Sequence, residues 1–199
     1  MMGTQILKEK QMKNITLCVM VAVFLLSCAT SEEFVRPGTD FKKYKRIAIF
    51  PLTDYYSAPG SGIQVADILS MKMLSSPLQI IDRSQTQLLL QEQQFGLSGL
   101  MDEQTAVKAG NLIGVQAILT GSINKWSTSR VNIQLVQGAA PAMMDVANAG
   151  VTLKLIDCET GLVIWAGSAD GSYTGPNQES TAAAKAVDHL LKQFKARLY

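Results

Sequence analysis

Val151-Thr152-Leu153-Lys154-Leu155-Ile156-Asp157 is the segment from which the fold is most readily inferred, because apolar and polar residues alternate along most of it. Alternation with a period of two predicts a β-strand with one buried face. Residues 158–161 follow as a turn that ends in Gly161, and residues 162–168 form a second apolar run. Two such runs joined by a short turn predict an antiparallel β-hairpin.

Strands and helices alternate in the chain before this hairpin. The expected strands cover residues 46–52, 78–81 and 116–123, and the expected helices start at Ser61, Ser84 and Asp102. Ser61 with Gln64 fits a capping box, and Gly114 ends the third helix. A last helix follows Asn177, with Ala183, Val187, Leu190, Leu191, Phe194 and Leu198 on one side. This order predicts an α/β (α+β) domain with a mixed sheet of about five strands, packed by three to four helices.

Residues 125–148 are the least regular part of the chain. Val131 and Ile133 alternate with Asn132, but Pro141 and Asp145 interrupt the second half. One interpretation is a surface loop or an extended strand edge. The alternative is a membrane hairpin, since two membrane strands of about 9–11 residues each would fit this length.

The N-terminus has the form of an export signal. Lys8, Lys10 and Lys13 precede the apolar residues 15–26, which is the pattern of a basic region followed by a hydrophobic region. The apolar run is short for a transmembrane helix, which needs roughly 20 residues. Translation could begin at Met1 or at Met12, because Met12 opens a more compact signal.

Leu25-Leu26-Ser27-Cys28 ends the apolar run and resembles a bacterial lipobox. In that motif the cysteine thiol receives diacylglycerol, and the new amine receives a further acyl chain after cleavage. Two or three acyl chains hold a protein stably on a membrane, where one gives marginal binding. Ala29 stands where an aspartate would retain a lipoprotein at the inner membrane of a Gram-negative bacterium. We therefore expect covalent lipid on Cys28 and the periplasmic face of the outer membrane, with no other cofactor.

The lipobox divides the chain into three parts. Residues 1–27 form the signal peptide, residues 28–44 carry the lipidated cysteine and a tether, and residues 45–199 form the folded periplasmic domain. The tether is expected because residues 29–44 are polar or turn-forming and show no regular period. Sixteen residues reach at most about 55 Å when fully extended.

Several classes of function are disfavoured by composition. The formal net charge of +2 lies entirely in residues 1–27, so the mature chain is neutral and lacks the basic excess of a nucleic-acid-binding protein. His189 is the single histidine, and the three cysteines are far apart, so neither a zinc site nor a catalytic triad is indicated. Cys158 has no partner in the mature chain and is expected to be buried. We therefore predict no catalytic residues, no metal and no enzymatic activity.

Three stretches together carry a family resemblance. They are Phe50-Pro51-Leu52, the block from Ile81-Asp82-Arg83-Ser84 to Gly121-Ser122, and the hairpin of residues 155–161 with Ile164-Trp165. They resemble the CsgG/HfaB-like family of bacterial lipoproteins over about residues 45–198. The resemblance implies a sheet of the TolB N-terminal type, an architecture that LpoB-type activators of peptidoglycan synthases share. Fold alone does not choose between these functions.

The resemblance also sets expectations about function. Pore-forming members assemble as rings and contribute two β-hairpins per subunit to a membrane barrel, but only six residues lie between Asp170 and Asn177, too few for a second hairpin. The loop of residues 53–60, which forms the constriction in channel members, makes Tyr55 and Tyr56 candidate contact residues. We expect a lipid-anchored scaffold or assembly protein that associates with envelope or secretion proteins and with copies of itself. The alternative is an LpoB-like regulator that docks on a peptidoglycan synthase, which would need a long tether to cross the periplasm.

Overall fold

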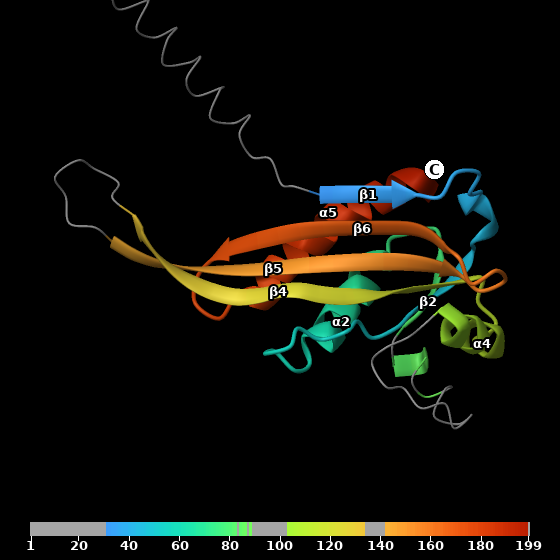
Figure 1. Cartoon of the computed structure of the whole chain (residues 1–199), viewed down its shortest axis with the longest axis horizontal. Coiled ribbons are helices and arrows are strands. Elements are labelled where there is room, and N and C mark those ends of the chain that lie inside the picture. The colour runs from blue at the N-terminus through green and yellow to red at the C-terminus, as the bar shows by residue number, and fades with distance from the viewer. Residues whose placement is uncertain (1–30, 83, 87, 89–102, 134–141, 199) are drawn as a thin grey trace, which may run out of the picture. The chain divides into compact units, whose positions relative to one another are not determined.

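Six strands form one mixed sheet in the part of the chain that the computed structural model describes, residues 31–82, 84–86, 88, 103–133 and 142–198 (Figure 1). The strands are β1 (Ser31–Val35), β2 (Arg46–Ile49), β3 (Gln79–Ile81), β4 (Ala117–Ile133), β5 (Ala142–Asp157) and β6 (Val163–Thr174). Their order across the sheet is β1-β6-β5-β4-β2-β3. Neighbours from β1 to β4 are antiparallel, and β2 lies parallel to both β4 and β3. The predicted mixed sheet and the predicted β5–β6 hairpin are therefore confirmed, with one strand more than expected.

Helices cover both faces of this sheet. Helices α2 (Ser61–Met73) and α5 (Glu179–Leu198) pack on one face, and α5 passes behind β5 and β6 in Figure 1. Helix α4 (Glu103–Ile113) packs on the other face, over β4 and β5. Gly114 ends α4 with a φ of 67°, as the sequence predicts, because glycine adopts this left-handed conformation without a side-chain clash.

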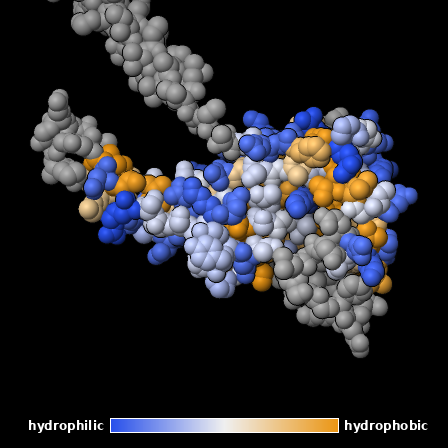
Figure 2. Space-filling view, in the orientation of Figure 1, coloured by the Kyte–Doolittle hydropathy of each residue, from blue (hydrophilic) through white to orange (hydrophobic). Residues whose placement is uncertain are grey.

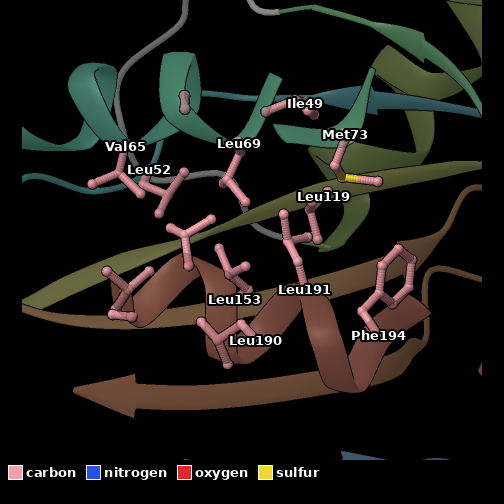
Figure 3. Close-up of a cluster of buried hydrophobic side chains, with 14 of the residues drawn as sticks. Ile49, Leu52, Val65, Leu69, Met73, Leu119, Leu153, Leu190, Leu191 and Phe194 are labelled. Carbon is pink, nitrogen blue, oxygen red and sulfur yellow. The ribbon is translucent and has the colours of Figure 1, made fainter. Parts of the chain in front are cut away.

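The main core lies between the sheet and the pair α2 and α5 (Figure 3). Leu69 and Met73 of α2 face Leu190, Leu191 and Phe194 of α5 across the inward side chains of β4 and β5. All five side chains are buried, and the three from α5 belong to the apolar face predicted for the last helix. The helical spacing of these residues gives each helix one apolar stripe, which fixes the side that meets the sheet.

A smaller core lies under α4 on the opposite face. It joins Ala109 and Ile113 to Ile118, Ile156 and Cys158. Gly110 permits this close packing, since a β-carbon there would lie 2.1 Å from the sulfur of Cys158. The predicted burial of Cys158 is therefore confirmed, at 2% exposure.

The prediction of a tether over residues 28–44 is wrong from residue 31 onward. Residues 31–35 form β1, which pairs with β6 from Ser31 opposite Ala169 to Val35 opposite Trp165. Phe41–Lys43 then form the 3-10 helix η1, in which Phe41 is buried. The polar composition of β1 concealed it, because its inward side chains are satisfied by distant polar partners. Residues 28–30 lie outside the described residues.

Of the two interpretations of residues 125–148, a surface loop is wrong where the structure describes them, whereas extended strand is observed; a membrane role of this hairpin stays a prediction. Residues 125–133 and 142–148 continue β4 and β5 as one long antiparallel hairpin. Register shifts at a β-bulge between Ile123 and Lys125, and beyond it Arg130 pairs with Asp145. We call residues 125–133 and 142–148 the arm.

The start of α2 differs from the expected capping box. Gly60 occupies the N-cap position with a φ of 84°, and no side chain caps the helix there. Ser61 lies inside the first turn, and its Oγ accepts a hydrogen bond from the backbone N–H of Tyr55. The serine therefore organises the preceding loop instead of the helix end.

Candidate functional site

Strand β1 is held on the domain by a polar cluster around Glu33. The carboxylate accepts hydrogen bonds from Trp165 Nε1 at 2.8 Å and from Arg197 Nη2 at 2.7 Å. The hydrogen bond from Arg197 lowers the pKa of Glu33 against the opposing effect of burial, with the Trp165 bond and the charge of Arg197 acting in the same direction. Gln193 Nε2 also donates to Ser31 Oγ at 2.9 Å. Helix α5 therefore forms hydrogen bonds with two inward residues of β1, Ser31 and Glu33. The start of the described chain is thus an integral part of the sheet.

Replacement of Glu33 by alanine should destabilise the fold by about 1–2 kcal/mol, the usual cost of leaving a buried donor such as Trp165 Nε1 without its partner. Glu32 is the matched control, because it is exposed and no ion pair of the described residues involves it. Glu32→Ala should change stability by less than about 0.5 kcal/mol. Urea unfolding followed by circular dichroism measures both, and equal effects of the two substitutions would contradict the role given to Glu33.

A second cluster fixes η1 to the turn between β5 and β6. Asp157 is 2% exposed; its Oδ2 accepts hydrogen bonds from Tyr44 and from Lys43 Nζ, the latter at 2.6 Å. Its Oδ1 accepts from the backbone N–H groups of Glu159 and Thr160, both at 2.8 Å. Burial alone would raise the pKa of Asp157, but the bonds from Lys43, Tyr44, Thr160 and Glu159 together hold it well below its usual range. Burial and the bond to Asp157 raise the pKa of Tyr44 to about 12.

The loop of residues 53–60 follows β2 and places the two candidate contact tyrosines. Asp54 accepts hydrogen bonds from Gly60 and Gly62 through its two carboxylate oxygens, at 2.8 and 2.7 Å. Tyr55 is partly buried against the core, and Tyr56 is 86% exposed, with 4.5 Å between the two ring centroids. The loop is therefore well organised and displays Tyr56 to solvent. A contact role for Tyr55 and Tyr56 stays a prediction.

The arm has two unlike sides. On the side of the sheet that α5 covers, Thr128 Oγ1 donates a hydrogen bond to Glu179 of α5. On the same side, Arg130 Nε donates to Asp145 Oδ1 at 2.9 Å. By the alternation of side chains along a strand, Val131 and its partner Met144 lie on the other side. Figure 2 shows apolar side chains gathered toward the end of the arm, where Val131 is 36% exposed. The alternation around Val131 predicted extended structure here, but not the pairing of residues 125–133 with residues 142–148 as a continuation of β4 and β5.

The remaining candidate residues do not form a catalytic or metal site where the structure describes them. His189 lines a shallow groove between α5 and β1, with Ser31, Lys192 and Arg197. Among the described residues, no group of three or more histidine, cysteine or acidic side chains could hold a metal ion. None of the described helices is both long and apolar enough to span a membrane. Leu25, Leu26, Ser27 and Cys28 lie outside the described residues, so lipidation of Cys28 stays a prediction.

The Cys158 thiol should be inert in the folded protein. Burial is the main reason that its pKa is raised to about 12, and the negative charge of Asp157 acts in the same direction. Since the thiolate is the reactive form, a thiol reagent at pH 8 should leave native Cys158 unmodified and modify it fully in urea. The mature Cys28→Ser chain contains this single cysteine and suits the assay. Rapid labelling without denaturant would contradict the burial.

Sequence reasoning missed the two clusters that hold residues 31–44 on the domain. Glu33 contacts Trp165 and Arg197, which lie 132 and 164 positions away in the sequence. Asp157 is 113 positions from Tyr44. No local pattern marks such partners, and residues 31–35 show no alternation of apolar and polar residues that would predict a strand.

Comparison with solved structures shows the same fold in two bacterial proteins, PelC and lipoprotein GNA1162. The PelC dodecamer from Paraburkholderia phytofirmans is 16% identical, with a TM-score of 0.51 over 84% of this chain and 98% of that chain. Lipoprotein GNA1162 from Neisseria meningitidis is 14% identical, with a TM-score of 0.53 over 75% of this chain and 96% of that chain. The C-terminal domain of LpoB from Escherichia coli is more distant, with 11% identity and a TM-score of 0.46 over 67% and 87% of the two chains. At these identities the likeness concerns the fold.

Comparison with curated proteins finds no significant match. The family model described as "Curli production assembly/transport component CsgG" matches residues 3–194. This match includes the β2 strand, the β5–β6 hairpin and nearly all of α5. Because it spans almost the whole sequence, the chain belongs to the CsgG family.

Proposed function

We propose that this protein is a lipid-anchored assembly or scaffold component of the cell envelope, held on the periplasmic face of the outer membrane by acyl chains on Cys28. Membership of a family described as an assembly and transport component supports an envelope role. The lipobox Leu25-Leu26-Ser27-Cys28 supports the anchor, and Ala29 supports the outer membrane. The protein acts by binding, without catalytic turnover.

The observation that carries this proposal is the position at which the fold begins. Strand β1 starts at Ser31, three residues after Cys28. Three residues span at most about 11 Å, so the anchored domain stays next to the membrane that holds it. A component that works at the membrane surface suits this geometry.

The same observation disfavours the LpoB-like alternative. A regulator that reaches a peptidoglycan synthase across the periplasm needs a long flexible segment between its lipid and its folded domain. Residues 31–44 contain β1 and η1 instead of a tether. The remaining reach of about 11 Å is far below the roughly 55 Å of a tether that extends to residue 44.

We further propose that copies of the chain associate with one another, as PelC does in its dodecamer. The arm and the loop that carries Tyr56 are the exposed surfaces that support this proposal, since both display apolar or aromatic side chains. Four residues join β6 to α5, which is too few for the second membrane hairpin of a two-hairpin channel. Association is therefore proposed without a two-hairpin pore.

Native mass spectrometry of the full lipidated chain in detergent tests the association. We expect a single homo-oligomer of defined copy number, which Val131→Lys weakens because the charge falls on the apolar side of the arm. Lys154→Glu on β5 provides a control substitution away from the arm. Monomers at all concentrations would contradict self-association, and steady single-channel conductance in bilayers would contradict the absence of a pore.

A further inference from the structure

The surface closest to the lipid can be located from the fold. The lipid anchor on Cys28 is part of the proposed function, and the following inference rests on it. Ser31 is three positions after Cys28, so their Cα atoms lie at most about 11 Å apart. Ser31 is the first residue of β1, and β1 is an edge strand of the sheet that the described residues form. That edge must therefore lie near the lipid head groups.

The neighbour of Ser31 at this edge is the C-terminal half of α5. Gln193 Nε2 donates to Ser31 Oγ at 2.9 Å, and Arg197 binds Glu33 two residues further along β1. A groove of about 590 Å³ lies between the strand and the helix, and Ala196 and His189 contribute to its lining. Any membrane contact made near Ser31 thus involves this half of the helix.

Charge gives this surface a chemical preference. The acidic side chains that lie between β1, α5 and α2 already have basic partners, Glu33 with Arg197 and Asp188 with Lys72, each at 2.7 Å. Glu32, which makes no ion pair among the described residues, points to the opposite side of β1. Lys192 is exposed and makes no ion pair in the described part of the chain.

Lys195 carries a second positive charge that makes no ion pair among the described residues. Within the same part of the chain, its ammonium group donates to the carbonyl oxygen of Lys72 and to Ser75 Oγ, at the C-terminal end of α2. Lys192 lines the groove beside β1. Neither lysine makes an ion pair in the described part of the chain, and both lie on the C-terminal half of α5. Juxtamembrane lysines are attracted to anionic lipid surfaces by about 1 kcal/mol each.

We propose that β1 and the C-terminal half of α5 form the surface that lies on the bilayer, with Lys192 and Lys195 contacting the phosphates of anionic phospholipids. Helix α4 then points away from the membrane. It packs on the other face of the sheet over β4 and β5, and β4 is separated from β1 by three strand spacings. At about 4.8 Å per spacing, the two regions differ in distance from the lipid by well over 10 Å.

A paramagnetic relaxation experiment measures this orientation. The full lipidated chain is placed in phosphatidylcholine vesicles that contain a nickel-chelating lipid, with a spin label at Ala196→Cys on α5 or at Leu112→Cys on α4. Both native residues are exposed, and the buried Cys158 is not expected to react with the label. We expect relaxation enhancement at least threefold greater at position 196 than at position 112. Equal enhancement, or a greater effect at position 112, would overturn the proposed orientation.

The lipid preference is tested with matched charge reversals. In vesicles with 30% phosphatidylglycerol, we expect the enhancement at position 196 to rise at least twofold over pure phosphatidylcholine. Lys192→Glu with Lys195→Glu should abolish this rise, whereas Lys108→Glu with Lys154→Glu makes the same change in charge on other surfaces and should retain it. If the double variant fails to fold, the single variant Lys192→Glu replaces it. This substitution removes no side-chain hydrogen bond in the described part of the chain and should halve the rise. A rise that survives the α5 substitutions, or no rise in the wild type, overturns the role of the two lysines.

The results expected if Cys28 carries no lipid differ from those expected if β1 and α5 do not face the membrane. A chain without lipid would neither float with the vesicles nor carry the mass of acyl chains, and this result would remove both the proposed function and the inference that rests on it. A chain that floats but shows no difference between positions 196 and 112 leaves the anchor intact and refutes the surface alone.

Discussion

Asp157→Ala should destabilise the domain by about 3 kcal/mol, the lower end of the range for breaking a buried ion pair. The lower end applies because Lys43 is 45% exposed and can be hydrated after the change. Tyr44 remains buried and loses the acceptor of its hydroxyl group, and two backbone N–H groups of the β5–β6 turn lose theirs. For a domain of this size the midpoint of thermal unfolding should fall by roughly 6–12 °C.

Glu159→Ala is the matched control for Asp157. Glu159 lies in the same turn, 3.9 Å from Lys43 Nζ, but its side chain is 84% exposed. Its removal should change stability by less than about 0.5 kcal/mol. Thermal unfolding by circular dichroism compares the two variants. A midpoint for Asp157→Ala within 2 °C of the wild type, a margin of about 1 kcal/mol or less, would show that the cluster does not hold η1 on the domain.

The contribution of Asp157 should also depend on pH. Because its pKa is lower in the folded state than in the unfolded state, the unfolded chain takes up the proton first as the pH falls. The stabilisation is therefore complete above the unfolded pKa of about 3.9 and is lost as the pH falls toward the folded value. Urea unfolding at several pH values should show the wild type and Asp157→Asn converging below about pH 4. A constant difference from pH 7 to pH 2 would contradict the assigned pKa shift.

Gly171→Ala should have an effect of similar size, about 3 kcal/mol, at the upper end of the range for overpacking. A β-carbon at position 171 would lie 2.0 Å from the carbonyl oxygen of Ala182 and 2.8 Å from the backbone nitrogen of Ala186. These are backbone atoms of α5, so relief requires the whole helix to move away from β6. The variant should therefore expose part of the main core.

Gly150→Ala tests whether contact with backbone causes that effect. Its β-carbon would meet the side-chain oxygens of Asn124 and Asp170 at 2.0 and 2.6 Å, and both side chains can rotate away. We expect a loss of about 1 kcal/mol, below that of Gly171→Ala. Hydrogen exchange should show faster exchange in α5 for Gly171→Ala alone. Similar exchange in the two variants would contradict this packing.

Much of the fold follows from local patterns. The alternation from Val151 to Leu155 predicted β5 because one face of that strand is packed against α5 and the other is not. The spacing of Val187, Leu190, Leu191 and Phe194 predicted α5 for the same reason, since one side of the helix must be apolar. Where burial is one-sided, the sequence carries a period that can be recognised.

Patterns are weak where an element is exposed over most of its length or where polar groups are buried in pairs. Most residues of the arm are exposed or partly exposed, and its alternation is incomplete, because Met143 lies 69% exposed on the side that also carries Thr128 and Asp145. In β1 the inward residues Ser31 and Glu33 are polar, and α5 satisfies them from the far end of the sequence. The tether prediction failed for this reason.

Some candidate functional residues could be predicted from the local sequence, and others depend on the three-dimensional fold. Tyr56 could be placed in an exposed loop from its position after a strand that ends at Pro51. Lys192 could not be related to the proposed anchor, because its proximity to Ser31 depends on the pairing of β1 with β6 and on the packing of α5. Only the fold brings Ser31 and the C-terminal half of α5 together at one edge of the sheet.

We propose that Cys28 carries the lipid that holds this domain at a membrane. Radiolabelled palmitate, supplied to a Gram-negative host expressing the full chain, checks for this lipid. The wild type and Cys158→Ser should incorporate label and sediment with the outer membrane, because the buried Cys158 plays no part in anchoring. Cys28→Ser should incorporate none and remain folded in the soluble fraction, whereas equal labelling of Cys28→Ser and the wild type would contradict the claim.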